Sequence, residues 1–272
     1  MAESAELGRL RAVLEGLGPA ALAVSGGVDS MTLAFVAHRL PGLQATVFHA
    51  VSPAVPPEAS ARVAEHARQH GWPLNVIDAG EFRDPDYLRN PGNRCFFCKT
   101  NLYGAIAART DARILSGTNL DDLDDYRPGL QAAEAHGVLH PYIEARIDKA
   151  AVRRLAGEMS LPTLAALPAS PCLSSRLQTG IAVRPETLAL VHAVERLIDR
   201  ALAPETARCR VRHDGITIEL DATSLARIER DEAAALRADL ARLCVRHRGS
   251  QTLRFRPYQR GSAFERPGRH AG

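Results

Sequence analysis

The sequence predicts an α/β protein, with a mostly parallel sheet in a first domain and a small α+β domain after it. Two observations in the first half of the chain support this prediction. Apolar runs alternate with helical patterns, and a glycine-rich turn joins the first run to a helix. A third observation lies in the last third, where Asp214-Gly215 separates two short apolar strands and gives a strong hairpin signal.

Five apolar runs in the first half have strand character, and helical patterns lie between and after them. The strand predictions cover residues 21–25, 45–51, 74–79, 113–118 and 138–142. The helix predictions cover residues 30–40, 57–70, 100–110, 127–136 and 148–159. Because such alternation requires crossover connections, we expect a Rossmann-like parallel sheet with helices on both faces and ligands at the carboxyl ends of its strands.

The second half of the sequence predicts a loop followed by the smaller domain. Residues 161–183 contain three prolines and no clear periodicity, which indicates a linker or a catalytic loop. The elements expected after it are a helix at 185–203, strands at 208–213 and 216–220, a broken helix at 222–243 and a strand at 252–256. We therefore expect a first domain over 1–165, a cysteine-bearing loop over 166–184, an α+β domain over 185–264 and a disordered tail over 265–272.

Composition excludes several classes of protein. Of the 272 residues, 46% are apolar and 24% are charged, which is typical of a globular protein. No apolar stretch approaches the roughly 20 residues that cross a bilayer. The amino terminus lacks a basic region followed by an apolar core, so we expect no secretory signal and a cytoplasmic location.

The net charge of +3 is too small to indicate nucleic acid by itself. Arginines are concentrated in the last third of the chain, at positions 208, 210, 212, 246, 248, 254, 256 and 260. Such a basic patch suits either RNA or a compact phosphorylated small molecule.

The stretch Ser25-Gly26-Gly27-Val28-Asp29-Ser30 predicts a phosphate site between a strand and a helix. Two glycines let backbone N–H groups approach an anion, and the helix start adds further unpaired N–H groups. No Gly-Lys-Ser/Thr follows, so the stretch instead resembles the PP-loop of ATP pyrophosphatases, which cut ATP between its α- and β-phosphates. Residues 1–165 are thus expected to be a PP-loop domain that binds ATP through residues 25–30 and through Ser52, Gly117 and Thr118 at neighbouring strand ends.

Three of the five cysteines are candidate ligands of a metal centre. Cys95 and Cys98 form a C-x-x-C just before a predicted helix, and Cys172 adds a third thiol in a loop. An odd number of cysteines without an export signal favours thiolate or metal chemistry over disulfides. Three thiols leave one coordination position open, which favours an iron–sulfur cluster; zinc completed by histidine or water, and a metal-free thiol site, remain alternatives. We expect Cys209 and Cys244 to be buried apolar residues.

An acidic loop follows the fourth predicted strand. It runs from Gly117 through four aspartates to Gly129. Gly117 would let the backbone approach an adenine face, and Asp122 and Asp125 join Asp29 as candidate Mg²⁺ ligands. The other interpretation, an acidic helix start favoured by the helix dipole, explains some of these aspartates.

Taken together, these motifs resemble the ATP-dependent sacrificial sulfur transferase family (LarE). The resemblance rests on residues 25–30, 95–99, 117–130, 168–176, 210–219 and 260–262. It implies that ATP adenylates a carboxylate of a pyridinium biscarboxylate mononucleotide, and that sulfur then displaces AMP to give a thiocarboxylate in nickel-pincer nucleotide biosynthesis. It also implies a homo-oligomer. Because Cys95 and Cys98 are present, the chain resembles those members whose three cysteines hold a [4Fe–4S] cluster with an open iron that can bind a sulfide.

The resemblance also implies roles for residues of the second half. Cys172 would carry the sulfur chemistry, with Ser174 and Arg176 beside it. The substrate phosphate would bind at four positions and be oriented by a fifth: Arg210, Arg212, Arg260, Ser262 and, as the orienting residue, Glu219. The chain departs from the family at Asp124, where a glycine is expected, and in a shorter hairpin turn.

Two other functions remain as alternatives. A tRNA-thiolating PP-loop enzyme shares the phosphate loop and cluster cysteines, but such enzymes usually add zinc-ribbon cysteines or an RNA-binding domain, and neither is visible here. A small arginine-bearing domain suits a mononucleotide better than a tRNA, which argues against nucleic acid as a partner. A non-catalytic sensor of ATP and a cluster would not need the carboxylate of Asp29 or those of the acidic loop.

Overall fold

The computed structural model describes residues 3–123, 128–169, 171–248, 252–259 and 261–263. Asp125, Arg260 and the tail 265–272, which carried predictions, lie outside these ranges. The chain divides into two units. The first comprises Met1–Asp84 and Asn93–Ser170, and the second comprises Pro85–Gly92 and Pro171–Gly272. The two units have the α/β architecture that the sequence predicts.

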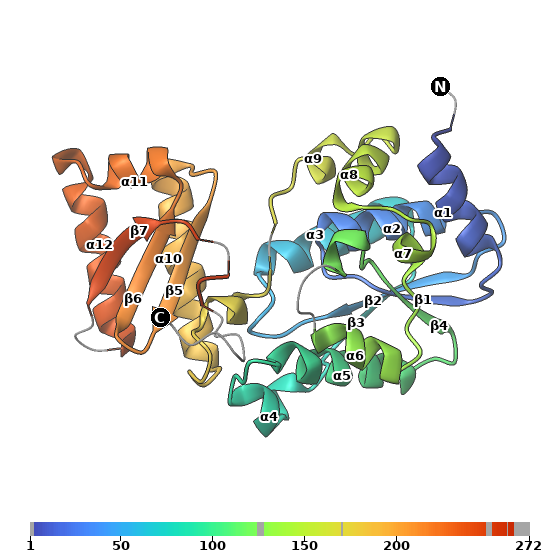
Figure 1. Cartoon of the computed structure of the whole chain (residues 1–272), viewed down its shortest axis with the longest axis horizontal. Coiled ribbons are helices and arrows are strands. Elements are labelled where there is room, and N and C mark those ends of the chain that lie inside the picture. The colour runs from blue at the N-terminus through green and yellow to red at the C-terminus, as the bar shows by residue number, and fades with distance from the viewer. Residues whose placement is uncertain (1–2, 124–127, 170, 249–251, 260, 264–272) are drawn as a thin grey trace. The chain divides into compact units, whose positions relative to one another are not determined.

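The first unit is built on a parallel sheet of four strands in the order β3-β2-β1-β4 (Figure 1). The strands are β1 (Ala20–Ala23), β2 (Ala45–Ala50), β3 (Leu74–Ile77) and β4 (Arg113–Ser116). In register, Ala20 lies opposite both Ala45 and Arg113, so all strand ends on the carboxyl side fall at one edge of the sheet. This edge is the expected ligand edge of a parallel α/β sheet.

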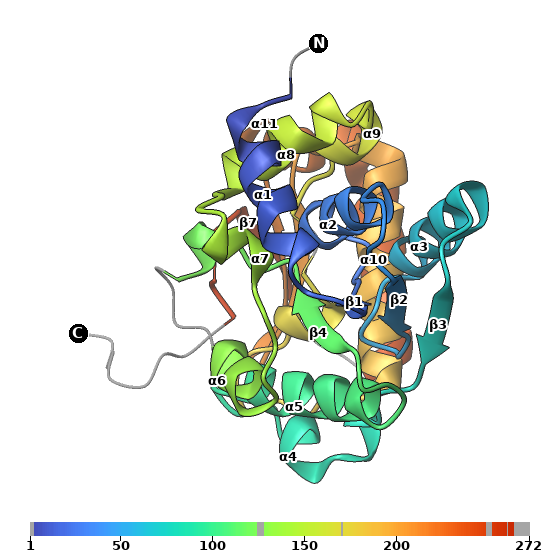
Figure 2. The same ribbon diagram turned by 90° about the vertical axis from the view of Figure 1, so that its right-hand side faces the viewer.

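Helices cover both faces of this sheet (Figures 1 and 2). One side carries α1 (Ala5–Glu15), α2 (Val28–His38) and α8 (Lys149–Glu158), and the other carries α5 (Arg94–Ala107) and α6 (Pro128–Ala135). Because side chains alternate along each strand, the sheet has a hydrophobic core on each face. Leu22 and Leu115 belong to one core, and Ala21 and Ile114 belong to the other. The remaining helices of this unit are α3 (Pro57–His70), α7 (Pro141–Glu144) and α9 (Pro162–Ala165).

The predicted strand at 138–142 is wrong. Only Leu139 pairs with the sheet, in an isolated parallel bridge to Leu115. The chain then enters α7 at Pro141, whose ring fixes φ and removes a backbone donor, so the ladder cannot continue. The helix α1 was not predicted, although Ser4 accepts from the N–H of Leu7 as its cap.

Trp72 of the first unit lies among histidines and a phenylalanine. Its ring stacks on His38, with centroids 4.8 Å apart, and meets Phe35 edge-on at 4.6 Å. His66 and His70 stack on each other at 5.9 Å. Burial lowers the pKa of His38 and of His66, and the charges of His70 and Arg62 lower the pKa of His66 further.

The second unit has a sheet of three strands in the order β5-β6-β7. The hairpin of β5 (Ala207–Arg212) and β6 (Gly215–Leu220) confirms the predicted turn, and β7 (Leu253–Pro257) lies parallel to β6. Gly215 has a φ of +138°, and a Cβ there would lie 2.4 Å from the carbonyl oxygen of Thr252, so the close approach of the segment before β7 requires glycine.

The apolar face of this second sheet packs on helices α10 (Pro185–Leu202) and α11 (Ala222–Ile228), and α12 (Ala234–Arg248) packs on these two helices. Cys209, Val211 and Ile218 are fully buried on that face. The opposite face carries arginines at alternate positions of β5 and β7. No helix in the described ranges has the length and apolar character needed to cross a bilayer.

A short segment from early in the chain completes the second unit. It holds α4 (Pro85–Leu88) and is bound by the loop that precedes α10. The N–H groups of Gly180 and Val183 donate to the carbonyls of Asn90 and Leu88, at 2.9 and 2.8 Å. The hydroxyl of Tyr87 lies 2.7 Å from that of Ser174, and both side chains are buried.

Candidate functional site

The predicted phosphate loop connects β1 to α2 at the ligand edge of the first sheet. Gly27 caps α2 without a side-chain hydrogen bond to the first-turn amides, which leaves those N–H groups for an anion. Gly26 has a φ of +83°, and a Cβ there would lie 2.6 Å from the carbonyl oxygen of Ala59 in α3. Glycine is therefore required at this position by the packing of the loop on α3.

Hydrogen bonds hold this loop in shape. The N–H of Ser25 donates to the Oγ of Ser30 at 3.1 Å, and that hydroxyl donates to the carbonyl of Gly27 at 3.3 Å. The guanidinium of Arg62 donates to the carbonyl of Gly26 at 2.6 Å. These hydrogen bonds hold the loop in this conformation without a ligand.

Asp29, in the first turn of α2, lies at the centre of a polar group that the sequence did not reveal. Its carboxylate accepts from the Nζ of Lys149 and, at 3.2 Å, from the Nδ2 of Asn119. The hydroxyl of Tyr142 donates to the backbone carbonyl of Asp29 at 2.9 Å. Burial raises the pKa of Tyr142 well above its usual value, and the charge of Asp29 raises it further, so the phenol remains a donor.

The other predicted ATP-binding residues follow neighbouring strands. Ser52 follows β2, and Gly117 and Thr118 follow β4, at the same edge as the phosphate loop. A Cβ on Gly117 would lie 2.8 Å from the backbone nitrogen of Ser30 and 2.9 Å from its Cα. Gly117 is thus needed for the close packing of this loop on α2, and its predicted role at the adenine stays a prediction.

The acidic loop begins with a short 3₁₀ helix, Leu120–Asp122. Asn119 accepts from the N–H of Asp121 at 3.1 Å, while Asp122 accepts from the N–H of Asn119 at 3.2 Å. This reciprocal pair is a capping box, so the helix-start interpretation accounts for one oxygen of Asp122. The role of Asp122 as a Mg²⁺ ligand stays a prediction, and Asp125 lies outside the described residues.

Cys95 and Cys98 lie inside α5, in its first two turns, not before the helix as the sequence predicted. Asn93 caps the helix, so it begins at Arg94 and places the two cysteines three residues apart on one face. Cys95 is exposed and Cys98 is half-buried. Both belong to the first unit, and Cys172 belongs to the second.

The other two cysteines are buried, as predicted. Cys209 and Cys244 are 0% and 1% exposed, and burial raises the pKa of both thiols. Cys172 is half-buried, so the three candidate ligands are also the three solvent-accessible thiols. Within each unit, the described residues form no group of three or more His, Cys, Asp or Glu side chains that could hold a metal ion.

A buried arginine fixes the loop that carries Cys172. The guanidinium of Arg176 binds the carboxylate of Glu195 on α10 through two hydrogen bonds of 3.0 and 2.9 Å. It also donates to the carbonyls of Pro171 and Cys172, at 2.7 and 3.3 Å. Arg176 is 3% exposed and Ser174 is fully buried, so both support this loop from the interior of the unit. A catalytic role for either residue stays a prediction.

Four of the five residues predicted at the substrate phosphate lie together in the second unit. Glu219 accepts from the Nε of Arg210 and from Arg212, both at 3.0 Å, and from the hydroxyl of Ser262 at 2.5 Å. Arg212 also donates to the carbonyl of Ser262 at 3.0 Å. Arg260, the fifth residue, lies outside the described residues.

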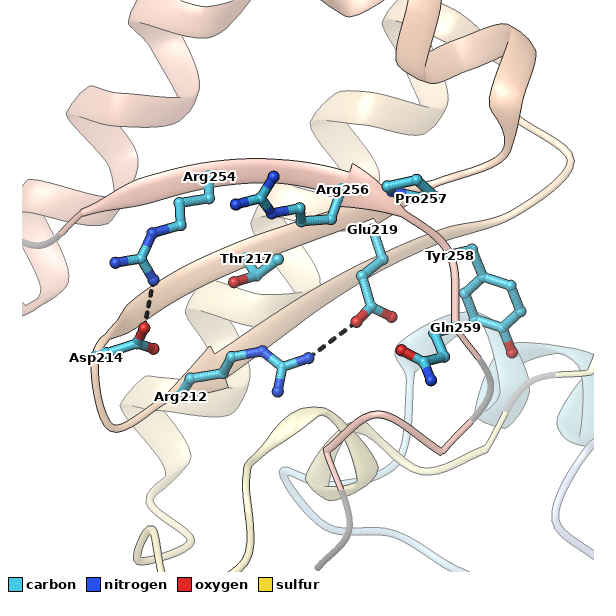
Figure 3. A pocket seen from close by; sticks show the side chains of 9 residues that line it. All are labelled: Arg212, Asp214, Thr217, Glu219, Arg254, Arg256, Pro257, Tyr258 and Gln259. Carbon is cyan, nitrogen blue, oxygen red and sulfur yellow. Dashed lines mark hydrogen bonds and ion pairs between the residues drawn. The ribbon is translucent and has the colours of Figure 1, made fainter. Parts of the chain in front are cut away.

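Two of these residues, Arg212 and Glu219, line one end of an open groove of about 850 Å³ over the polar face of the second sheet (Figure 3). The lining residues are Arg212, Asp214, Thr217, Glu219, Arg254, Arg256, Pro257, Tyr258 and Gln259. In Figure 3 the side chain of Arg212 reaches toward Glu219, while that of Arg254 turns toward Asp214 in the hairpin. The groove is therefore cationic with two internal carboxylates.

A parallel sheet with a glycine loop before α2, followed by a small mixed sheet, defines a Rossmann-like α/β protein. No protein-family model matches the chain. Among curated proteins it is 36% identical over 219 residues to the uncharacterized protein slr1717 of Synechocystis sp., covering 79% of this chain and 81% of that protein. The chain belongs to the same protein family as slr1717.

Two further relatives are more distant. Over 216 residues the chain is 29% identical to the pyridinium-3,5-bisthiocarboxylic acid mononucleotide synthase of Lactiplantibacillus plantarum, covering 78% of each protein. Over 181 residues it is 23% identical to the uncharacterized protein MJ0830 of Methanocaldococcus jannaschii, covering 65% of this chain and 68% of that protein. The relationship to the synthase supports the family resemblance seen in the motifs.

Proposed function

We propose that this protein is an ATP-dependent sulfur transferase that converts a carboxylate of a pyridinium mononucleotide into a thiocarboxylate, in the biosynthesis of the nickel-pincer nucleotide. The relationship to a pyridinium-3,5-bisthiocarboxylic acid mononucleotide synthase supports this class of substrate and product. The observation that carries the proposal is a network of buried charges that ties the Cys172 loop to the arginine groove.

Arg210 is the link in this network. It is 4% exposed and donates through Nη1 to the carbonyl of Ser175 at 3.1 Å, within the loop that begins at Cys172. Through Nε it binds Glu219, which in turn holds Arg212. An anion bound at Arg212 would therefore lie in the same rigid network as the thiol-bearing loop, which is the arrangement that sulfur transfer to a phosphorylated substrate needs.

The phosphate loop would supply activation of the carboxylate. A carboxylate oxygen attacks the α-phosphorus of ATP and pyrophosphate leaves, which gives an acyl adenylate. Sulfur then attacks the carbonyl carbon, and AMP leaves with the original oxygen. The free N–H groups at the start of α2 would stabilise negative charge on the departing pyrophosphate.

Two inorganic groups belong to this proposal. Carboxylate oxygens are the donors that Mg²⁺ takes, and Asp29 and Asp122 would supply them; Asp29 contacts Lys149 in this structure, so the metal would replace an ammonium there. Cys95, Cys98 and Cys172 would hold the [4Fe–4S] cluster, since thiolates are its protein ligands and these three thiols are accessible. When bound, that cluster would supply an open iron as a carrier of sulfide.

The test separates adenylation from sulfur transfer. Exchange of labelled pyrophosphate into ATP, dependent on the pyridinium biscarboxylate mononucleotide, reports adenylation, and mass spectrometry of the nucleotide reports the thiocarboxylate. We expect Asp29→Asn to lower exchange by about a hundredfold, the scale of losing one main electrostatic group at a reacting phosphate. We expect Cys172→Ser to keep exchange and lose the thiocarboxylate.

Cys244→Ala is the matched control, because this thiol is buried in α12 and has no proposed role. It should retain both activities. The proposal would be wrong if wild-type protein showed no exchange with the mononucleotide, or if Cys172→Ser formed thiocarboxylate at the wild-type rate. Iron and sulfide analysis of anaerobically purified Cys95→Ser, Cys98→Ser and Cys172→Ser tests the cluster, and full iron content in all three would reject it.

A further inference from the structure

The groove of the second sheet contains two arginines on β7 that the proposed phosphate site does not use. Arg254 lies opposite Thr217 in register, and Arg256 lies opposite Glu219. Because side chains alternate along a strand, both project to the same face as Arg210 and Arg212 of β5. That face therefore carries cations on both outer strands of the sheet.

The two ends of the groove are held by different carboxylates. Arg212 is bound to Glu219, whereas Arg254 is bound to Asp214 in the hairpin at 2.5 Å. Arg256 makes no hydrogen bond or ion pair with any residue in the described part of the chain, and its guanidinium points over Thr217 toward Arg254 (Figure 3). The β7 end thus offers an uncompensated charge beside an oriented guanidinium, which is a suitable arrangement for an anion.

The two cationic ends are separated by β6. Neighbouring strands lie about 4.8 Å apart, so the backbones of β5 and β7 are about 10 Å apart. With a volume of about 850 Å³, the groove is large for one phosphate and lies in the usual range for a small-molecule site. It suits a compact ligand that has one anionic group at each end.

We propose that Arg254 and Arg256 form a second anion subsite, which binds a ring carboxylate of a pyridine mononucleotide whose phosphate lies at Arg212. This inference rests on the proposed function for the Arg212 end only. It makes the β7 arginines the residues that select an acid over an amide on the pyridine ring. Asp214 and Glu219 on the same face repel an extended phosphate backbone, so the groove favours a small dianion over RNA.

The test uses two ligands that differ in this one group. Nicotinate mononucleotide carries a ring carboxylate where nicotinamide mononucleotide carries an amide. By calorimetry, wild-type protein should bind the nicotinate form about tenfold more tightly, the low end of the range for hydrogen bonds to a charged group. The double variant Arg254→Gln/Arg256→Gln should lose this preference and retain its affinity for the amide form.

Arg242→Gln is the matched control, since Arg242 also pairs with an exposed carboxylate, Asp239, in the same unit. It should keep the preference, and circular dichroism with thermal melts checks that each variant folds. Equal binding of the two ligands by wild-type protein would overturn the subsite, as would a preference that survives in the double variant.

Three further binding experiments identify the second anionic group of the ligand and separate this subsite from the proposed phosphate site. Ribulose 1,5-bisphosphate tests whether the second group is a phosphate. If it bound more tightly than nicotinate mononucleotide, and if this binding depended on Arg256, the carboxylate assignment would be wrong. If single-stranded RNA bound more tightly than either nucleotide and the double variant lost it, the small-ligand site would be wrong. If Arg212→Gln left both nucleotides unaffected, the phosphate site would fail while the β7 subsite stood.

Discussion

Glu219→Gln is the substitution that tests most directly whether the buried charge network stabilises the second unit. Glu219 is 2% exposed and satisfies two guanidinium groups and one hydroxyl. Glutamine keeps its size but removes its charge, and so leaves Arg210 buried without a counter-ion. Removing one partner of a buried pair costs about 3–5 kcal/mol.

The structure favours the lower end of that range. The side chain of Arg210 is 5% exposed, but that of Arg212 is 25% exposed, so water screens part of the loss. Glutamine also keeps one carbonyl oxygen as an acceptor. We therefore expect a loss of about 3 kcal/mol in the free energy of unfolding of the second unit, or about 10 °C in its midpoint.

The assay is urea unfolding followed by circular dichroism, with hydrogen exchange and mass spectrometry of β5 and β6 to assign the loss to this unit. Asp239→Asn, which removes an exposed partner of Arg242 in α12, is the control and should cost less than about 1 kcal/mol. If Glu219→Gln lay within the error of this control, the network would contribute nothing to stability and the argument from burial would be wrong.

Two further predictions concern the first unit. Gly117→Ala should lower the free energy of unfolding by about 1–3 kcal/mol and weaken ATP binding, because the new Cβ would meet the backbone of Ser30. Gly8→Ala in α1 is the control and should not destabilise the protein, since a Cβ there meets nothing within 4 Å. Equal melting temperatures of the two variants would contradict this prediction. Burial lowers the pKa of His38 and His66 in the folded protein, so the unfolded chain binds more protons than the folded chain below about pH 6.5. The contribution of these histidines to stability is therefore complete above about pH 6.5, and it is lost as the pH falls toward their folded pKa values. Trp72 is the chain's one tryptophan, so its fluorescence should report this acid transition, and a double His38→Asn/His66→Asn variant should flatten it; an unchanged pH profile would contradict the assignment.

Local sequence patterns were sufficient to predict the four strands of the first sheet, the glycine turn before α2 and the hairpin. Each depends on residues within a few positions, such as the glycine pair before α2 or Asp214-Gly215. The sequence does not indicate where α5 begins, because its cap, Asn93, makes no side-chain hydrogen bond to the helix start and follows a proline-glycine pair that indicates a turn. Apolar content at 138–142 predicts a strand, but Pro141 starts a helix there and ends the pairing after Leu139.

Contacts between distant residues could not be predicted in the same way. Asp29 and Lys149 are 120 positions apart, and no motif joins them. The bond from Arg176 to Glu195 links a loop to a helix whose sequence indicates only an amphipathic pattern. Such pairs are set by how the elements pack, so a single sequence carries no signal of them.

The segment 85–92 means that neither unit is a continuous piece of the chain. A fragment beginning at Pro171 would lack Tyr87 and Asn90, leaving the buried hydroxyl of Ser174 without the phenol beside it and the N–H of Gly180 without its acceptor. Exchanging the Cys172-bearing half between homologues therefore takes two grafts, not one cut. During synthesis these eight residues must also wait for partners that the ribosome adds about ninety residues later, so the segment that contacts the Cys172 loop is among the last to be fixed in place.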